Sequence, residues 1–124
     1  MNKQEGIDFT ERYFAALRKS KNKAVLDEYI SEEPLFGHIA FFDAAFPGYW
    51  LEALDTLVDG DKITVRFDAH GTHKGELMGI PPTGKTVKFE GIIIYQLADG
   101  KIVNHWMQTD MVSLLQQLGA MPTA

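Results

Sequence analysis

The sequence predicts an α+β domain in which helices come first and a meander of antiparallel strands follows. Apolar residues recur at helical spacing in the first third of the chain, and from residue 63 onward they alternate with polar residues. Glycine-containing turns separate the alternating segments, as in sheets built from hairpins. A bent antiparallel sheet has a concave face. Helices covering that face would enclose a pocket for a small ligand.

The composition indicates one globular domain spanning residues 1–124. The hydrophobic fraction is 45% and the charged fraction 23%, which argues against disorder. The absence of cysteine excludes disulfides, zinc–thiolate sites and cysteine nucleophiles. A net charge of -5 without a basic run argues against nucleic-acid binding. The polar start, Met1–Gly6, and the short apolar runs predict no signal peptide, no membrane span and a cytoplasmic protein.

Three helices are expected before the sheet. Asp8, with Glu11 three residues later, predicts the start of the first helix in the manner of a capping box. Asn22 is suited to cap a second, short helix. The apolar stretch His38–Phe46 is expected to form one or two further helical turns, which Pro47–Gly48 would end.

Four strands and a short terminal helix are expected to complete the domain. The expected strands are Tyr49–Val58, a segment around Ile63–Ala69, Lys85–Leu97 and Lys101–Asp110. The apolar spacing of the first of these fits a helix nearly as well. Gly91 predicts a bulge or bend in the third strand, and Asp99–Gly100 predicts a tight hairpin turn. Met111–Leu118 is expected to be a helix that ends at Gly119.

One segment matches the P-loop pattern G-x-x-x-x-G-K-[ST] letter for letter, at Gly79–Thr86. Pro81 and Pro82 have no N–H group to offer a phosphate. The residues that follow, 87–95, have the period of a strand, whereas a P-loop must lead into a helix. We therefore expect a rigid connection between two strands, with Lys85 in solvent.

Several short segments carry a family resemblance because they occur together and in one order. They are Ala45–Pro47, Gly71–Glu76, Gly79–Lys85, Asp99–Ile102, His105–Trp106, Asp110 and Leu114–Gly119. Together they resemble the SnoaL-like polyketide cyclase family, within the nuclear transport factor 2-like superfamily. The first 44 residues resemble the family only in pattern.

The resemblance implies a cone-shaped barrel, in which a strongly curved, mostly antiparallel sheet wraps around the N-terminal helices and encloses an apolar cavity. It implies a homodimer and a small apolar or aromatic ligand. It also implies cofactor-free acid/base catalysis on a carbonyl compound, by aldol-type cyclisation, isomerisation or hydration, as in a cyclase-like lyase or isomerase. The alternative is a non-catalytic ligand-binding or dimerisation protein of the same fold.

Asp110 is the catalytic candidate that the resemblance implies, near the end of the last strand. A carboxylate desolvated in a pocket could remove a proton beside a carbonyl and return it. Asp110 also directly precedes the terminal helix, where aspartate is a preferred N-cap. On a regular strand Asn104, Trp106 and Gln108 face the same way as Asp110, so these three are expected to bind substrate.

Four more residues are predicted to contact substrate. Gln96 stands where the family's cyclases carry a histidine, and its amide could donate to an oxyanion. His38 lies on the apolar stretch over the expected pocket mouth, with a partly buried core position as the alternative. Trp50 belongs to an aromatic set that is core or pocket wall. Arg66 could anchor a substrate carboxylate or ester, although an exposed or aspartate-paired arginine on the polar face is the favoured interpretation.

No metal or cofactor is expected. His70 and His73 are three residues apart and would fall on opposite faces of a strand, which makes them a poor pair of ligands. His73 is expected to fix the local backbone by hydrogen bonding. His105 points opposite to Trp106 and is expected at a dimer contact or in strand packing, with a second proton carrier as the alternative.

Overall fold

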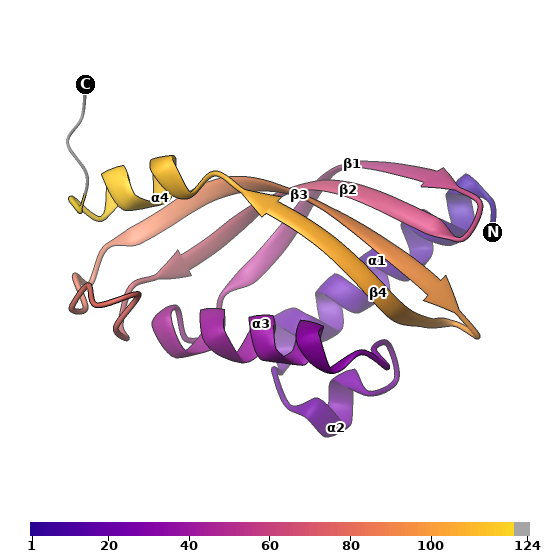
Figure 1. The fold of residues 1–124 in the computed structure, drawn as a ribbon, viewed down its shortest axis with the longest axis horizontal. Helices are drawn as coiled ribbons and strands as arrows, with labels where there is room; N and C mark the ends of the chain where they lie inside the picture. The colour runs from indigo at the N-terminus through magenta and orange to yellow at the C-terminus, as the bar shows by residue number, and fades with distance from the viewer. Residues whose placement is uncertain (121–124) are drawn as a thin grey trace.

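The computed structural model describes residues 1–120 and confirms an α+β domain (Figure 1). The elements in chain order are α1 (Lys3–Lys19), α2 (Lys23–Leu26), α3 (Glu33–Ala45), β1 (Trp50–Asp59), β2 (Lys62–Thr72), β3 (Thr86–Ala98), β4 (Lys101–Thr109) and α4 (Met111–Gln117). Helices α1 to α3 lie on one side of the curved sheet, and α4 packs against β3 near its start. The core therefore lies between the sheet and the first three helices.

The four strands form one antiparallel sheet in the order β1-β2-β3-β4, joined by hairpins. The sheet is open at both edges, so it forms a curved, cone-like wall over the helices (Figure 1). Along β2, residues that face inward alternate strictly with residues that face outward. Its buried residues are Ile63, Val65, Phe67 and Ala69. This alternation is the period of two that predicted the strand.

Two helices begin earlier than the sequence patterns predicted. Helix α1 is capped by Asn2, whose side chain accepts from the Glu5 N–H while Glu5 accepts from the Asn2 N–H. The predicted start at Asp8 was wrong, because Asp8 lies within the helix and accepts from Gln4. Helix α3 begins at Glu33, with Pro34 in its first turn, where a missing N–H costs nothing.

Of the bulge or bend that the sequence predicted at Gly91, the bulge was wrong. Gly91 pairs in register with Phe67, and a Cβ atom at Gly91 would lie 2.5 Å from Phe67 Cζ. The glycine therefore makes room for an aromatic ring on the facing strand. The register shift of β3 and β4 falls instead between Gln96 and Leu97, opposite Val103.

Residues 71–85 connect β2 to β3 as predicted, and the P-loop match has no helix behind it. After its two strand residues the connection is irregular, and residues 81–85 are exposed. His73 holds it together, because its N–H donates to the Lys85 carbonyl and its Nδ1 accepts from the Thr83 N–H. Within the described residues, no helix is long and apolar enough to cross a membrane.

Candidate functional site

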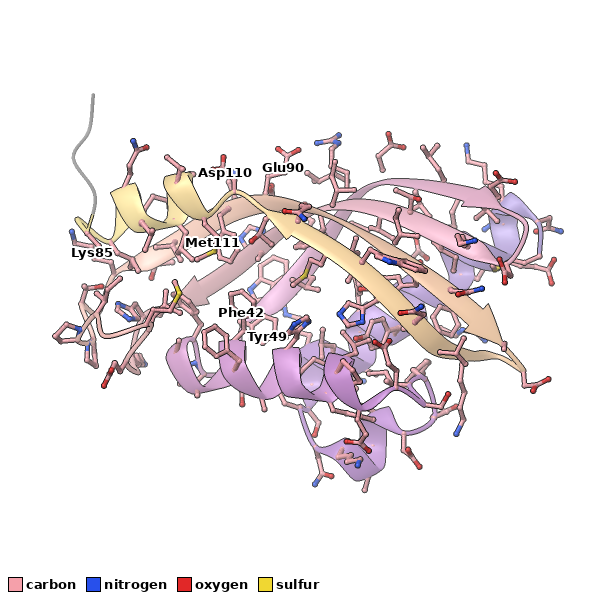
Figure 2. The ribbon with its side chains drawn as sticks, in the orientation of Figure 1. Phe42, Tyr49, Lys85, Glu90, Asp110 and Met111 are labelled. Atoms are coloured by element: carbon pink, nitrogen blue, oxygen red, sulfur yellow. The ribbon has the colours of Figure 1, made fainter. Side chains whose placement is uncertain are left out.

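A pocket opens between α3 and the concave face of the sheet, with α1 beneath it. Its cavity volume is about 50 Å³, and the pocket is partly open to solvent. Its walls are almost entirely apolar and aromatic. Figure 2 shows two of the wall residues, Phe42 and Tyr49, lying between α3 and the sheet. Such a wall favours a flat apolar ligand over a charged one.

Three tyrosines line this pocket: Tyr13 on α1, Tyr49 directly before β1, and Tyr95 on β3. The rings of Tyr13 and Tyr95 meet edge to face, with centroids 5.7 Å apart. Burial is the main cause that raises the pKa of all three hydroxyls above the ordinary value. They therefore remain protonated at neutral pH and are able to donate hydrogen bonds to a bound oxygen atom.

A chain of three titratable side chains begins at the pocket. His38, on α3, lines the pocket as predicted, and its Nδ1 lies 2.9 Å from Nε2 of His105. The two rings are perpendicular, with centroids 4.9 Å apart. His105 Nδ1 in turn lies 2.7 Å from Oε1 of Glu32. The side chains of His105 and Glu32 are only 4% and 10% exposed, so this part of the chain is shielded from water.

Glu32 and His105 were not among the site residues predicted from the sequence. Glu32 directly precedes α3, and the sequence offers no periodicity or motif that singles it out from its neighbour Glu33. His105 was expected in strand packing or at a dimer contact, with a second proton carrier as the alternative. The contact that joins Glu32 to His105 spans 73 residues of sequence, so it depends on how α3 docks under β4.

The structure places Asp110 outside the pocket. Its Oδ1 accepts from the Ser113 N–H at the start of α4, so it is the helix N-cap that the sequence offered as the alternative. Figure 2 shows Asp110 and Glu90 on the face of the sheet opposite to Phe42 and Tyr49. The expectation that Asp110 faces the cavity was therefore wrong, and its predicted catalytic role stays a prediction.

The residues predicted to share its face do so, but that face is the outer one. Asn104, Trp106 and Gln108 are exposed, whereas Met107 and Thr109 line the pocket. The physical reason is the β-bulge at Val103, the extra residue between the pairs Gln96↔Asn104 and Leu97↔Ile102. Even-numbered Ile102 is fully buried before the bulge, and odd-numbered residues point inward after it.

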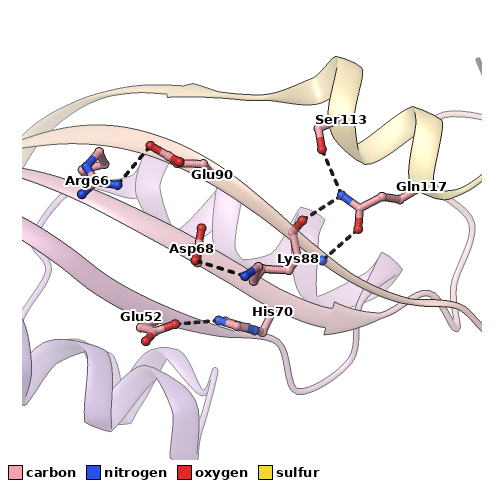
Figure 3. Close-up of polar contacts among 8 residues, drawn as sticks. All are labelled: Glu52, Arg66, Asp68, His70, Lys88, Glu90, Ser113 and Gln117. Atoms are coloured by element: carbon pink, nitrogen blue, oxygen red, sulfur yellow. Dashed lines mark hydrogen bonds and ion pairs between the residues drawn. The ribbon is translucent and has the colours of Figure 1, made fainter. Parts of the chain in front are cut away.

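Gln96, Arg66 and Trp50 also lie outside the pocket. Gln96 Nε2 donates to Asp61 Oδ2 at 2.9 Å, and this hydrogen bond is the main cause that lowers the pKa of the Asp61 carboxyl. Arg66 pairs with Glu90 at 3.4 Å on the outer face, within a row of cross-strand polar contacts (Figure 3). Trp50 stacks on His70, with ring centroids 4.0 Å apart. Of the predicted site residues, only His38 lines the pocket.

His70 does not pair with His73 but meets two carboxylates on the outer face. Its Nε2 lies 3.0 Å from Glu52 Oε1, and one ligand atom each from Glu52, Asp68 and His70 lies within 4.8 Å of the others (Figure 3). Cross-strand pairing of β1 and β2 creates this group, which the sequence spacing did not reveal. Because Lys88 Nζ lies 3.9 Å from Asp68 and Glu52 is half exposed, we assign no ion to it.

Comparison with known protein families gives one match over nearly the whole chain. A family model described as SnoaL-like polyketide cyclase matches residues 4–118. The aklanonic acid methyl ester cyclase DnrD of Streptomyces peucetius is 32% identical over 69 residues, which is 56% of this chain and 48% of the relative. The nogalonic acid methyl ester cyclase of Streptomyces nogalater is 38% identical over 50 residues, 40% of this chain and 37% of the relative. These matches span less than half of each curated relative.

Solved structures match over the full length of the fold. AclR from Streptomyces galilaeus, a proposed hydroxylase, superposes with a TM-score of 0.84 at 25% identity, covering 98% of this chain and 89% of AclR. IdmH from Streptomyces antibioticus, a proposed polyketide cyclase, gives a TM-score of 0.78 at 28% identity, covering 92% of this chain and 98% of IdmH. The same fold therefore carries two differently named activities, and the side chains of the pocket must distinguish between them.

Proposed function

Because this chain belongs to the SnoaL-like polyketide cyclase family, we propose that it catalyses a cofactor-free acid/base reaction on a flat, apolar carbonyl compound. The single observation that carries the proposal is the imidazole of His38 in the wall of a mostly apolar pocket, in which His70 is the other histidine among the described residues. Imidazole is the side chain best suited to accept and return a proton near neutral pH. The reaction types that fit are aldol-type cyclisation, isomerisation and hydration, of which the relatives' names favour cyclisation.

For a cyclisation the steps balance without an oxidant or cofactor. His38 removes a proton from the carbon beside a carbonyl group, and the electron pair of that C–H bond delocalises into an enolate. The enolate carbon then attacks a second carbonyl carbon of the same molecule, which forms the new C–C bond and an alkoxide. His38 returns its proton to the alkoxide. The neutral tyrosine hydroxyls would stabilise the enolate oxygen by donating hydrogen bonds.

The proposal is tested by binding and by proton abstraction, with 2-tetralone as a flat aromatic ketone probe. Methyl-labelled methionine gives the binding readout by NMR, because Met107 lines the pocket whereas Met78 lies on an exposed loop. We expect the Met107 signal to shift during titration and the Met78 signal to stay in place. Deuterium incorporation from D2O beside the ketone should then run faster with protein than with buffer alone.

The two readouts separate catalysis from its alternative. Binding at Met107 without accelerated deuterium incorporation would contradict the enzyme and favour a ligand-binding protein of the same fold. A Met107 signal that does not respond to the ketone would contradict the pocket as the substrate site. Accelerated incorporation that persists in His38→Gln would contradict the role of His38.

We further propose that the protein is a homodimer joined through the outer face of the sheet. Large apolar side chains are exposed there, and Ile94 pairs across strands with the 48% exposed Trp106. Leu57 and Ile92 extend this patch. Trp106→Glu should shift the sedimentation coefficient from that of a dimer to that of a monomer. A monomeric unmodified protein would contradict the proposal.

We keep the cytoplasm as the proposed location, to be tested by cell fractionation.

A further inference from the structure

We propose that Glu32 and His105 are positioning residues that fix which nitrogen of His38 carries a proton, so that Nε2 of His38 is the basic atom of the site. This inference rests on the proposed function and adds the atom that performs it. The carboxylate of Glu32, His105 and His38 are joined in line by contacts of 2.7 and 2.9 Å. Both distances are those of hydrogen bonds, and the shorter one is typical of a bond to a charged oxygen.

The direction of each hydrogen bond follows from the carboxylate. An ionised carboxylate can only accept, so Nδ1 of His105 carries the proton that it donates to Glu32. A neutral His105 then has a lone pair on Nε2, which accepts from Nδ1–H of His38. A neutral His38 with its proton on Nδ1 has its lone pair on Nε2. Neutral histidine in water prefers the other tautomer, so the two hydrogen bonds select the form whose basic nitrogen is Nε2.

The burial of Glu32 and His105 behind the exposed His38 gives these two residues a second role. Oε2 of Glu32 is buried and has no hydrogen-bond partner among residues 1–120. Within the described chain, Glu32 therefore makes its hydrogen bond only through His105. When Nε2 of His38 accepts a proton, the imidazole ring becomes positively charged. The shielded carboxylate of Glu32 stabilises this charge by electrostatic attraction. The arrangement differs from a lone surface histidine, which has no such carboxylate and prefers the Nε2–H tautomer in water.

The test reads the tautomers directly and does not depend on turnover. Two-bond ¹⁵N–¹H correlations of the histidine rings, recorded at about pH 8.5 where an unperturbed imidazole is neutral, report which nitrogen carries the proton. We expect Nδ1–H for both His38 and His105. In Glu32→Gln the acceptor becomes an amide that can also donate, so we expect the Nε2–H form of His38 to appear. The matched control is Glu33→Gln, which makes the same chemical change in an exposed neighbour.

The outcomes distinguish this inference from the proposed function. Nε2–H on His38 in the unmodified protein, or an unchanged Nδ1–H form in Glu32→Gln, would overturn the inference whatever the activity. Glu32→Asp retains a carboxylate, so it should restore the Nδ1–H form if Glu32→Gln has lost it. In the deuterium-incorporation assay Glu32→Gln should be slower by at least about tenfold, with an unchanged response of Met107 to the ketone. Correct tautomers without any catalysed incorporation would leave the inference standing and contradict the enzyme.

Discussion

Asp110 illustrates how one residue can satisfy two different expectations in a sequence. Its carboxylate accepts from the Ser113 N–H at the start of α4, and aspartate is among the best residues at that position. We expect Asp110→Ala to lower the free energy of unfolding by about 1 kcal/mol, whereas Asp110→Asn should cost only a few tenths. Urea denaturation measures both. Equal losses in the two variants would contradict the capping role.

Of the residues predicted for the site, the position of His38 was predictable from the sequence, whereas the others were not. His38 could be placed at the pocket because the apolar stretch around it had to cover the concave face of the sheet. Trp106 was assigned to the wrong face because one extra residue, Val103, inverts the alternation of β4, and no residue in the sequence marks that bulge. Glu32 could not be found at all, since its role depends on a contact with a residue 73 positions away.

At the scale of elements, Gly91 shows how one missing side chain allows two strands to pair. We expect Gly91→Ala to lower the free energy of unfolding by about 1–3 kcal/mol, because the new methyl group would overlap the ring of Phe67. Adding Phe67→Leu should make the combined loss smaller than the sum of the two single losses. Additive losses in the double variant would show that the ring is not the obstacle.

Gly37 is a glycine with free space around it, so Gly37→Ala is the control for Gly91→Ala. It lies in the interior of α3, and a Cβ atom there would have no heavy atom within 4 Å. Gly37→Ala should therefore raise the free energy of unfolding by about 0.5–1 kcal/mol, because alanine loses less backbone freedom in a helix. Thermal denaturation measures the change. A destabilised variant would contradict the open surroundings of this position.

Element types were more predictable than element ends. The alternating apolar residues of β2 and the strand-like stretch after Gly84 specified their strands, because a half-buried sheet demands a period of two. The starts of α1 and α3 were missed, because the polar residues Asn2 and Glu32 precede helical turns with little apolar pattern. Helix ends depend on local capping, which several polar residues in a row can supply equally well.

At the scale of the whole molecule, the three buried tyrosines predict an alkaline limit to stability. Their pKa values are raised in the folded protein, so the unfolded chain loses these protons first as the pH rises. Their contribution is complete below about pH 10, and above it the free energy of unfolding should fall by about 1.4 kcal/mol per pH unit for each tyrosine. Tyr95→Phe should make this pH dependence less steep by the contribution of one tyrosine. An unchanged slope would contradict the burial of the Tyr95 hydroxyl.

The pocket is a property of the whole fold, because its walls come from α1, α3 and all four strands. The α+β class, the helices-then-strands order and an apolar cavity could all be predicted, since they follow from periodicity and from the curvature of antiparallel sheets. The contacts of Glu32 and His105 behind His38 could not, since they depend on the docking of α3 beneath β4. The proposed function therefore rests on a few side chains of the pocket, which the fold alone does not specify.

The central claim is that His38 is the acid/base group of the pocket. Its most direct test is the rate at which deuterium from D2O enters 2-tetralone, compared between the unmodified protein, His38→Gln and Asp110→Asn, with Glu33→Gln as the control. The account predicts that His38→Gln lowers the protein-catalysed rate by about a hundredfold or more, the typical contribution of a general base. A full rate in His38→Gln, or a comparable loss confined to Asp110→Asn, would contradict it.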